Sequence, residues 1–115
     1  MKQLYISVVI PTYNEGENVI PIYNHLTKVL KKIDKNYELI FIDDGSTDNT
    51  LSKLKKLRNL DKKVKIITFT KNFKKASALS VGLARASGKV IITMDADLQD
   101  DPSEIPRLLG KMQQG

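Results

Sequence analysis

The sequence of 115 residues contains no cysteine, which excludes a disulfide framework and a thiolate metal site. This absence fits a reducing compartment, and we expect the chain in the cytoplasm. No apolar run approaches the roughly 18–20 residues that span a bilayer. The first run, Leu4–Ile10, is short, ends at Pro11 and lacks a small-residue cleavage site, so it predicts a strand and not a signal peptide. The few prolines and glycines are scattered, which argues against a linker or a low-complexity tract.

Two common nucleotide-binding fingerprints are also missing. No Gly-x-Gly-x-x-Gly follows the first predicted strand, so the nicotinamide-type motif is absent. The run from Gly82 to Lys89 is no P-loop, because its glycines are one residue too far apart and no Ser or Thr follows the lysine. His25, the single histidine, falls in the middle of a predicted helix, and we interpret it as structural.

The charge balance is basic, with a formal net charge of +6 and a pI near 9.5. Such a balance suits a polyanion or a phosphate-rich ligand. It equally suits lysines that coat helix faces for solubility, so charge alone leaves both interpretations open. Hydrophobic residues make up 41% of the chain, an ordinary share for one globular domain with a core.

Apolar, β-branched runs alternate with stretches of helical spacing. The runs are Leu4–Ile10, Tyr37–Ile42, Val64–Phe69 and Val90–Met94. The helical stretches are marked by apolar residues from Val19 to Ile33, from Leu51 to Leu57 and from Ala76 to Ala86, with a fourth after residue 101. This alternation predicts a Rossmann-like α/β fold, a parallel sheet of about four strands with helices on both faces.

Local residues predict where the helices begin and end. Ser46, Thr47 and Asp48 can cap the second helix. Ser87-Gly88 is expected to close the third, with the glycine in a left-handed conformation. Asp101-Pro102-Ser103-Glu104 opens the fourth, where Pro106 leaves the first residue open.

Ligands of such sheets bind beyond the carboxyl ends of the strands, and the fourth strand is followed there by an acidic segment. Asp95 and Asp97 emerge directly after Ile91–Met94, and Gln99 lies two residues further on. Carboxylate and amide oxygens suit Mg²⁺ or another hard divalent cation held together with substrate phosphates. A solvated acidic turn before a helix explains the same residues equally well when they are considered alone.

The loops after the other strands add groups that suit a nucleotide. Tyr13 offers a flat face for a base and Glu15 a carboxylate for a ribose. Asp43 and Asp44 can accept hydrogen bonds from a base or a ribose, or can cap the next helix. Lys71, Lys74 and Lys75 can supply positive charge near a pyrophosphate, or form an ordinary solvated loop.

Three segments together resemble the family 2 glycosyltransferases, which have the GT-A fold. They are Val8-Val9-Ile10-Pro11-Thr12-Tyr13-Asn14-Glu15, Ile42-Asp43-Asp44-Gly45-Ser46-Thr47-Asp48, and Met94-Asp95-Ala96-Asp97-Leu98-Gln99-Asp100-Asp101-Pro102. The stretch Asn72–Leu83 is similar to that of the polyprenyl-phosphate and dolichol-phosphate sugar transferases.

The resemblance implies a role for individual residues. The metal ligands, for Mg²⁺ or Mn²⁺, would be Asp95, Asp97 and Gln99, with Asp97 catalytic. The nucleotide-binding residues would be Pro11, Tyr13, Glu15, Asp43, Asp44, Lys75 and Asp95.

The implied reaction is inverting transfer of a sugar from a UDP- or GDP-sugar to a polyprenyl phosphate. A saccharide hydroxyl is the alternative acceptor. A Mg²⁺-dependent phosphoacceptor domain is the rival enzyme class, but it needs an acidic cluster where this chain has Pro11-Thr12. A nucleic-acid module is not expected, because the aromatic sheet face or the arginine-rich helix of such modules is missing.

Members of the resembled family continue past the fourth helix. We therefore expect residues 1–115 to be the N-terminal, nucleotide-sugar-binding part of a longer enzyme at the cytoplasmic face of the membrane, acting in cell-envelope polysaccharide synthesis. Alone, this part is expected to transfer no sugar and to be prone to self-association through uncovered apolar faces and a sheet edge.

Overall fold

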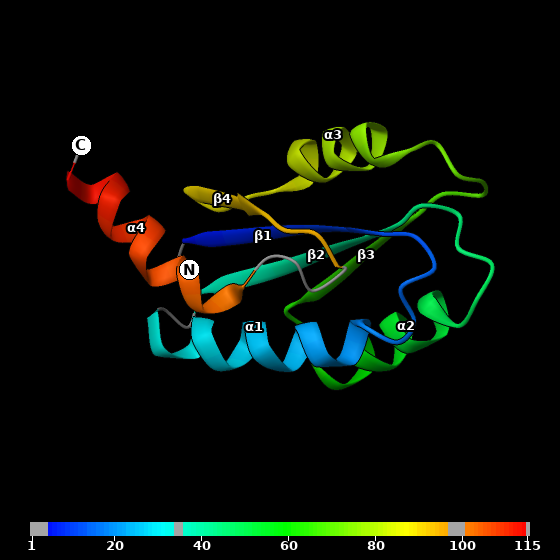
Figure 1. Ribbon diagram of the computed structural model, residues 1–115, viewed down its shortest axis with the longest axis horizontal. Coiled ribbons are helices and arrows are strands. Elements are labelled where there is room, and N and C mark those ends of the chain that lie inside the picture. The colour runs from blue at the N-terminus through cyan, green and yellow to red at the C-terminus, as the bar shows by residue number, and fades with distance from the viewer. Residues whose placement is uncertain (1–4, 34–35, 97–100, 115) are drawn as a thin grey trace.

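The computed structural model describes residues 5–33, 36–96 and 101–114 and contains one parallel sheet. Its strands are β1 (Ile6–Thr12), β2 (Tyr37–Asp43), β3 (Val64–Thr68) and β4 (Val90–Thr93), in the order β3-β2-β1-β4. The helices are α1 (Val19–Ile33), α2 (Thr50–Leu60), α3 (Lys75–Arg85), the short 3₁₀ helix η1 (Pro102–Glu104) and α4 (Ile105–Gln114). Helices α1 and α2 lie on one side of the sheet and α3 on the other (Figure 1). The predicted four-stranded parallel sheet with helices on both faces is confirmed.

The strand order creates a switch point between β1 and β4. The chain moves outward from β1 through β2 to β3, then returns to place β4 on the free side of β1. Ile6 is paired with Tyr37 of β2 on one side and with Val90 of β4 on the other. Because all four strands are parallel, their carboxyl ends meet at one edge, and that edge is where such sheets bind ligands.

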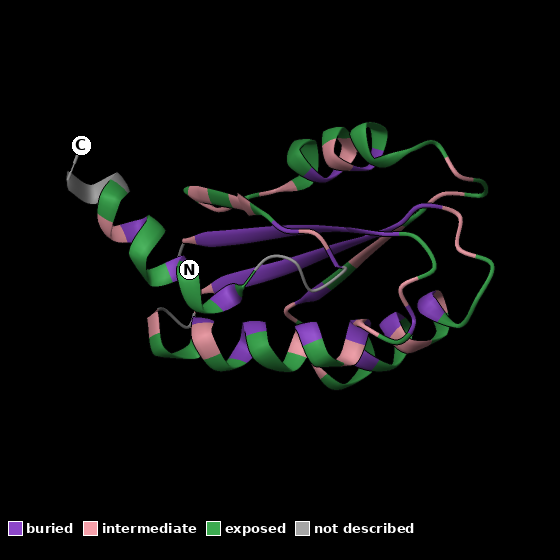
Figure 2. Cartoon of the chain, in the orientation of Figure 1, coloured by how far each residue is buried: buried purple, intermediate pink, exposed green. Residues whose placement is uncertain are grey.

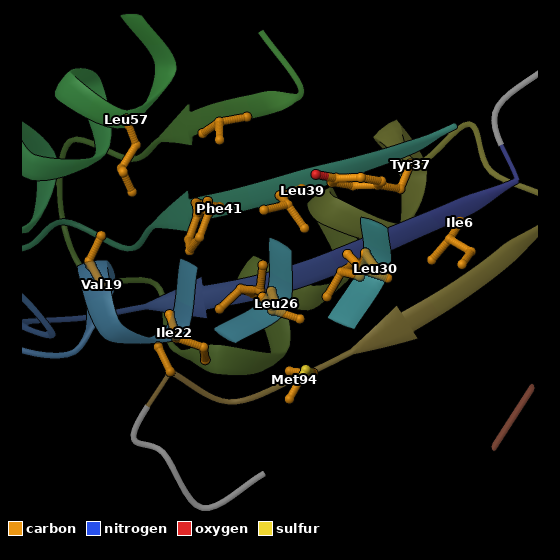
Figure 3. Close-up of a cluster of buried hydrophobic side chains, with 14 of the residues drawn as sticks. Ile6, Val19, Ile22, Leu26, Leu30, Tyr37, Leu39, Phe41, Leu57 and Met94 are labelled. Carbon is orange, nitrogen blue, oxygen red and sulfur yellow. The ribbon is translucent and has the colours of Figure 1, made fainter. Parts of the chain in front are cut away.

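The core lies mainly between the sheet and helix α1. Ile22, Leu26 and Leu30 of α1 are buried against Leu39 and Phe41 of β2 (Figure 3). The outer sides of the helices are exposed, whereas β1 and β2 are buried along their whole length (Figure 2). None of the described helices is both long and apolar enough to cross a membrane.

Helix α3 approaches the opposite sheet face more closely, through a glycine. A Cβ atom on Gly82 would lie 2.4 Å from Val9 Cγ1 and 2.8 Å from Ile42 Cδ1. Only a residue without a side chain fits there, so the helix rests directly on the sheet. This contact fixes the height of α3 above β1, and with it the start of α3 beside the carboxyl ends of the strands.

The first strand extends further than predicted, through Pro11 to Thr12. In a strand, the N–H and C=O of one residue point to the same side, and the side alternates along the chain. The carbonyl of Val9 accepts from Met94 N, and that of Thr12 from Asp44 N. Position 11 therefore faces β4, whose ladder has already ended at Thr93. The prediction that the strand ends at Ile10 is wrong, because the missing N–H of Pro11 removes no ladder hydrogen bond between the described strands.

Three predicted helix boundaries also need correction. Gly88 is not in a left-handed conformation, since Gly45 is the positive-φ glycine of the described residues. Gly88 is required for a close approach instead, because a Cβ there would lie 2.7 Å from Ser7 N. At the second helix the N-cap position is held by Asn49, whose own side chain makes no capping hydrogen bond. Asp101-Pro102-Ser103-Glu104, predicted to open the fourth helix, instead forms the 3₁₀ helix η1, with Asp101 accepting from Ser103 N at 2.9 Å, and α4 follows from Ile105.

A buried carboxylate ties three strands together at the opposite edge of the sheet. Glu38 of β2 accepts from Ser7 Oγ at 2.5 Å, from Lys65 Nζ at 2.5 Å and from Ser87 N at 2.8 Å. The side chain of Glu38 is 1% exposed and that of Lys65 52%. Burial by itself would raise the pKa of the Glu38 carboxyl, but these hydrogen bonds outweigh it and hold the pKa below its ordinary value.

We expect Glu38→Gln to make the free energy of unfolding less dependent on pH in the acid range. The pKa of Glu38 is lower in the folded chain than in the unfolded chain. The stability that its carboxylate contributes is therefore fully present above about pH 4.5 and is lost as the pH falls through the folded pKa. At pH 7 the variant should lose about 1.5–3 kcal/mol, the usual worth of hydrogen bonds to a charged group. Urea unfolding at pH 7 and pH 3.5 measures both effects. An equal loss of stability on acidification in the variant and the wild type would contradict the assignment.

Candidate functional site

A cavity of about 310 Å³ opens at the carboxyl ends of β1 and β4. The loops that follow β1, β2 and β3 lie together at this end of the sheet, at the right of Figure 1. The cavity is lined by aromatic, acidic and basic side chains from four segments of the chain: Pro11, Thr12, Tyr13, Glu15, Asp44, Asn72, Lys74, Lys75, Asp95 and Ala96. Six of the predicted site residues therefore meet at one place, namely Pro11, Tyr13, Glu15, Asp44, Lys75 and Asp95.

The loop that carries Tyr13 and Glu15 is held by the loop after β2. Asn14 adopts a positive φ of 53°, which asparagine tolerates better than most residues. Its side-chain oxygen accepts from Thr47 N at 2.8 Å, and its backbone N–H donates to Ser46 Oγ at 2.9 Å. Because Asn14 is turned toward this second loop, its neighbours Tyr13 and Glu15 are left facing the cavity.

Asp48 completes the connection between these two loops. Its carboxylate accepts from Gly16 N at 3.1 Å and from both Thr50 N and Thr50 Oγ1, at 2.9 and 2.5 Å. Desolvation opposes the charge, but the hydrogen bonds from Thr50 and Gly16 prevail and lower the pKa of Asp48 below its usual value. Of the three predicted caps, only Asp48 binds the first turn of α2, while Ser46 and Thr47 bind Asn14 instead.

The adjacent carboxylates at the end of β2 have different surroundings, although both are buried. Asp43 Oδ1 accepts from Ser46 N at 3.1 Å and so closes the turn after the strand. Asp43 does not line the cavity, whereas Asp44 does. The sequence left open whether each aspartate faces a ligand or forms the turn before the next helix. In the structure Asp43 forms the turn, and Asp44 lines the cavity.

Asp44 also anchors the loop after β3. It accepts from Phe73 N at 2.7 Å and from Asn72 Nδ2 at 3.1 Å. The neighbouring Gly45 has a φ of +73°, and a Cβ on it would lie 2.3 Å from the backbone carbon of Lys71. The absence of a side chain at Gly45 therefore allows the two loops to pack backbone to backbone.

The basic residues of this loop have separate positions. Lys75 forms an ion pair with Asp95, and Lys74 lines the cavity beside it. Lys71 instead places its ammonium 5.2 Å from the centre of the Phe73 ring, in a cation–π contact, and is not a lining residue. His25 lies away from the cavity on α1, with Nε2 3.7 Å from Asp101 Oδ1.

The predicted cation site is described only in part. Asp95 lines the cavity, while Asp97 and Gln99 lie outside the described residues. Among residues 5–33, 36–96 and 101–114, no three His, Cys, Asp or Glu side chains are grouped as a metal site would need. The carboxylates of Glu15, Asp44 and Asp95 around the cavity are nonetheless oxygen donors of the type that Mg²⁺ and Mn²⁺ prefer.

Sequence reasoning missed how the loops of the site are supported, since it assigned Asp48 only to the cap of the second helix. Asn14, Asp48 and Thr50 position the first loop, and Asn72 positions the third. An asparagine directly after an aromatic residue in a turn, or a lone glycine between Asp44 and Ser46, could have indicated an unusual backbone. The partners of these residues lie 28 to 35 positions away in the chain, so no local pattern predicts the pairs.

Comparison with curated proteins identifies relatives that are named as sugar transferases. The glycosyltransferase CsbB of Bacillus subtilis (strain 168) is 48% identical over 99 residues, 86% of this chain and 30% of that protein. An undecaprenyl-phosphate 4-deoxy-4-formamido-L-arabinose transferase of Proteus mirabilis (strain HI4320) is 41% identical over 111 residues, 96% of this chain and 34% of that protein. The chain thus spans about a third of the length of these relatives.

Solved structures share the fold. Glucosyl-3-phosphoglycerate synthase from Mycobacterium tuberculosis, in complex with Mn²⁺, UDP and glucosyl-3-phosphoglycerate, superposes with a TM-score of 0.70 at 26% identity. The match covers 97% of this chain and 40% of that one. Residues 7–115 also match the glycosyl transferase family 2 model, essentially from the first strand onward. With its parallel GT-A-type sheet and its relatives, the chain belongs to glycosyl transferase family 2.

Proposed function

We propose that this chain binds the nucleotide-sugar donor of a glycosyltransferase, in the cavity at the carboxyl ends of β1 and β4. The observation that carries the proposal is that an aromatic face, carboxylates and ammonium groups together line one cavity of about 310 Å³. A nucleoside diphosphate needs all three, for its base, its ribose and its phosphates. The volume lies at the lower end of the range typical for small-molecule sites.

The nucleoside part is assigned to the β1 side of the cavity. Tyr13 is 45% exposed beside Pro11, so a base can stack on its ring without a rearrangement of the core. Glu15 and Asp44 lie around the same space and can accept hydrogen bonds from ribose hydroxyls or from a base N–H. Both remain acceptors when their present contacts are kept, because an ionised carboxylate has about four lone-pair sites.

The diphosphate is assigned to the side where α3 begins and β4 ends. Lys74 and Lys75 bring positive charge to this side, and Asp95 faces Lys75. A divalent cation, Mg²⁺ or Mn²⁺, would be held by Asp95 together with Asp97 and Gln99. When bound, it would neutralise the negative charge that builds on the departing nucleoside diphosphate.

The chain's own residues then bind and orient the donor. Tyr13 and Asp44 fix the nucleoside. Lys75 would hold the phosphates once Asp95, its present partner, also binds the cation. The sugar is thereby presented beyond the strand ends to an acceptor that attacks from the opposite side, with inversion at the sugar carbon. Positioning of this kind can account for roughly 7–11 kcal/mol of a barrier.

A polyprenyl phosphate is the acceptor we propose. Support comes from the Proteus mirabilis relative, whose name specifies undecaprenyl phosphate. An anionic lipid phosphate needs no general base for its attack, whereas a saccharide hydroxyl does. Such an acceptor also places the enzyme at the cytoplasmic face of the membrane, where a role in the cell envelope would follow.

A transfer assay tests the acceptor. The 115-residue chain, and any longer protein that contains it, are supplied with UDP- or GDP-sugars, Mn²⁺ and either undecaprenyl phosphate or simple saccharides. From the longer protein we expect release of nucleoside diphosphate that depends on the lipid phosphate, and from the 115-residue chain alone we expect no release. Release by the longer protein with saccharides alone would instead support transfer to a hydroxyl group, and no release by it with any donor would contradict the proposed reaction.

A further inference from the structure

Lys74 has a backbone conformation that lysine rarely adopts. Its φ is 80° and its ψ is 160°, a region that is essentially restricted to glycine because a Cβ atom is crowded there. Only one other non-glycine residue of the described chain has a positive φ, Asn14, and its conformation is the ordinary left-handed one that asparagine tolerates. Strain of this kind concentrates at binding and catalytic sites, and Lys74 lines the proposed donor cavity.

The structure on both sides of Lys74 explains why the conformation is kept. Before it, Phe73 N is bound to Asp44, and the Phe73 ring packs edge-on against Phe69 at 5.6 Å. After it, Ala78 N donates to the carbonyl of Lys74, which begins helix α3. The helix itself is seated on the sheet through Gly82. Neither side can shift, so the change of chain direction falls on residue 74.

Glycine would remove this strain at position 74, so the lysine side chain is retained at a cost in stability. Its neighbours in the loop have other contacts: Lys75 is paired with Asp95, and Lys71 lies over Phe73. Within residues 5–33, 36–96 and 101–114, the ammonium of Lys74 forms no ion pair. It is exposed at the cavity, where it can meet an incoming anion without breaking an existing contact.

We propose that Lys74 is a donor-binding residue, whose ammonium binds the diphosphate and whose strained backbone is the stability cost of that contact. The inference rests on the proposed donor site and deepens it. Two lysines would then bind the phosphates in different ways. Lys75 also pairs with Asp95 of the proposed cation site, whereas Lys74 binds the phosphates whether or not a cation is present.

Three substitutions at residue 74 separate strain from charge. Lys74→Gly removes both, so its melting temperature should rise by roughly 3–6 °C while its affinity for UDP or GDP falls about tenfold, the loss of one charge-assisted contact. Lys74→Ala removes only the charge, so the affinity should fall equally and the melting temperature should stay within about 2 °C of wild type. Lys74→Arg should keep both wild-type values.

The measurements are calorimetry of UDP and GDP binding, with Mn²⁺ and with chelator, and thermal unfolding without ligand. Lys56→Ala, on the exposed side of α2 and not among the residues that line the cavity, removes an equal charge and serves as the control. Wild-type affinity in Lys74→Gly would overturn the phosphate contact, and a lower melting temperature would overturn the strain. If the wild type itself binds neither nucleotide, the proposed function fails and the phosphate contact fails with it, while the melting temperatures still decide whether residue 74 is strained.

Discussion

Replacing Asp95 by asparagine should abolish the gain in nucleotide affinity that the metal provides. With Mn²⁺ present, the affinity for UDP or GDP should fall on the order of 10- to 100-fold, because an amide does not hold a hard cation as a carboxylate does. With chelator present, the affinity should stay equal or rise. Asp95 no longer repels the diphosphate, and its partner Lys75 becomes available to bind it. Calorimetry in the two conditions measures both directions in one protein.

Asp101→Asn is the matched control for this substitution. It removes an equal charge close in sequence, its side chain is exposed, and asparagine can still accept the hydrogen bond from Ser103 N. We expect wild-type affinity in both conditions. A loss of affinity in Asp95→Asn that is the same with Mn²⁺ and with chelator would mean that Asp95 shapes the cavity and does not hold a cation.

Gly45→Ala should both destabilise the chain and disrupt the proposed donor site. The methyl group would be forced onto a residue with a φ of +73° and would lie 2.3 Å from the backbone of Lys71. The left-handed conformation costs about 1–2 kcal/mol for a residue with a Cβ, and overpacking adds about 1–3 kcal/mol. A loss of roughly 2–5 kcal/mol in the free energy of unfolding follows. The displaced loop carries Asn72, Lys74 and Lys75, so nucleotide affinity should fall as well.

Gly110→Ala provides the comparison, because a Cβ at that position in α4 meets no atom within 4 Å. Alanine is favoured over glycine inside a helix by about 1 kcal/mol, so this variant should be neutral or slightly more stable. Urea unfolding of both variants gives the comparison directly. Equal stability of Gly45→Ala and wild type would show that the loops after β2 and β3 are not packed backbone to backbone as the structure has them.

The sequence predicted the sheet and the edge that carries the site, because both follow from local patterns. Four short apolar runs between helical stretches are sufficient for a parallel sheet, and the polar segments after them had to meet at the carboxyl edge. The pattern could not divide the work between Asp43 and Asp44. Their roles depend on their hydrogen-bond partners: Asp43 accepts from Ser46, three residues away, and Asp44 accepts from Phe73, on a different loop.

The remaining misses are also tertiary in origin. Pro11 looked like the end of a strand, yet it continues β1 because, among the described residues, the β4 ladder on its side ends at Thr93. Gly88 looked like a helix terminator, but its neighbour Ser7 is 81 residues away. The network around Glu38 and the strain at Lys74 likewise depend on elements that meet only after the chain has folded.

The central claim, that this edge of the sheet binds a nucleoside diphosphate with the help of a divalent cation, is tested most directly by calorimetry on the wild-type chain. UDP and GDP are titrated with Mn²⁺, with Mg²⁺ and with chelator. We predict that at least one of the two nucleotides binds at a single site and that chelation weakens its binding about tenfold or more. Binding of equal strength with and without the cation would contradict the metal site, and the absence of binding by either nucleotide would contradict the donor site itself.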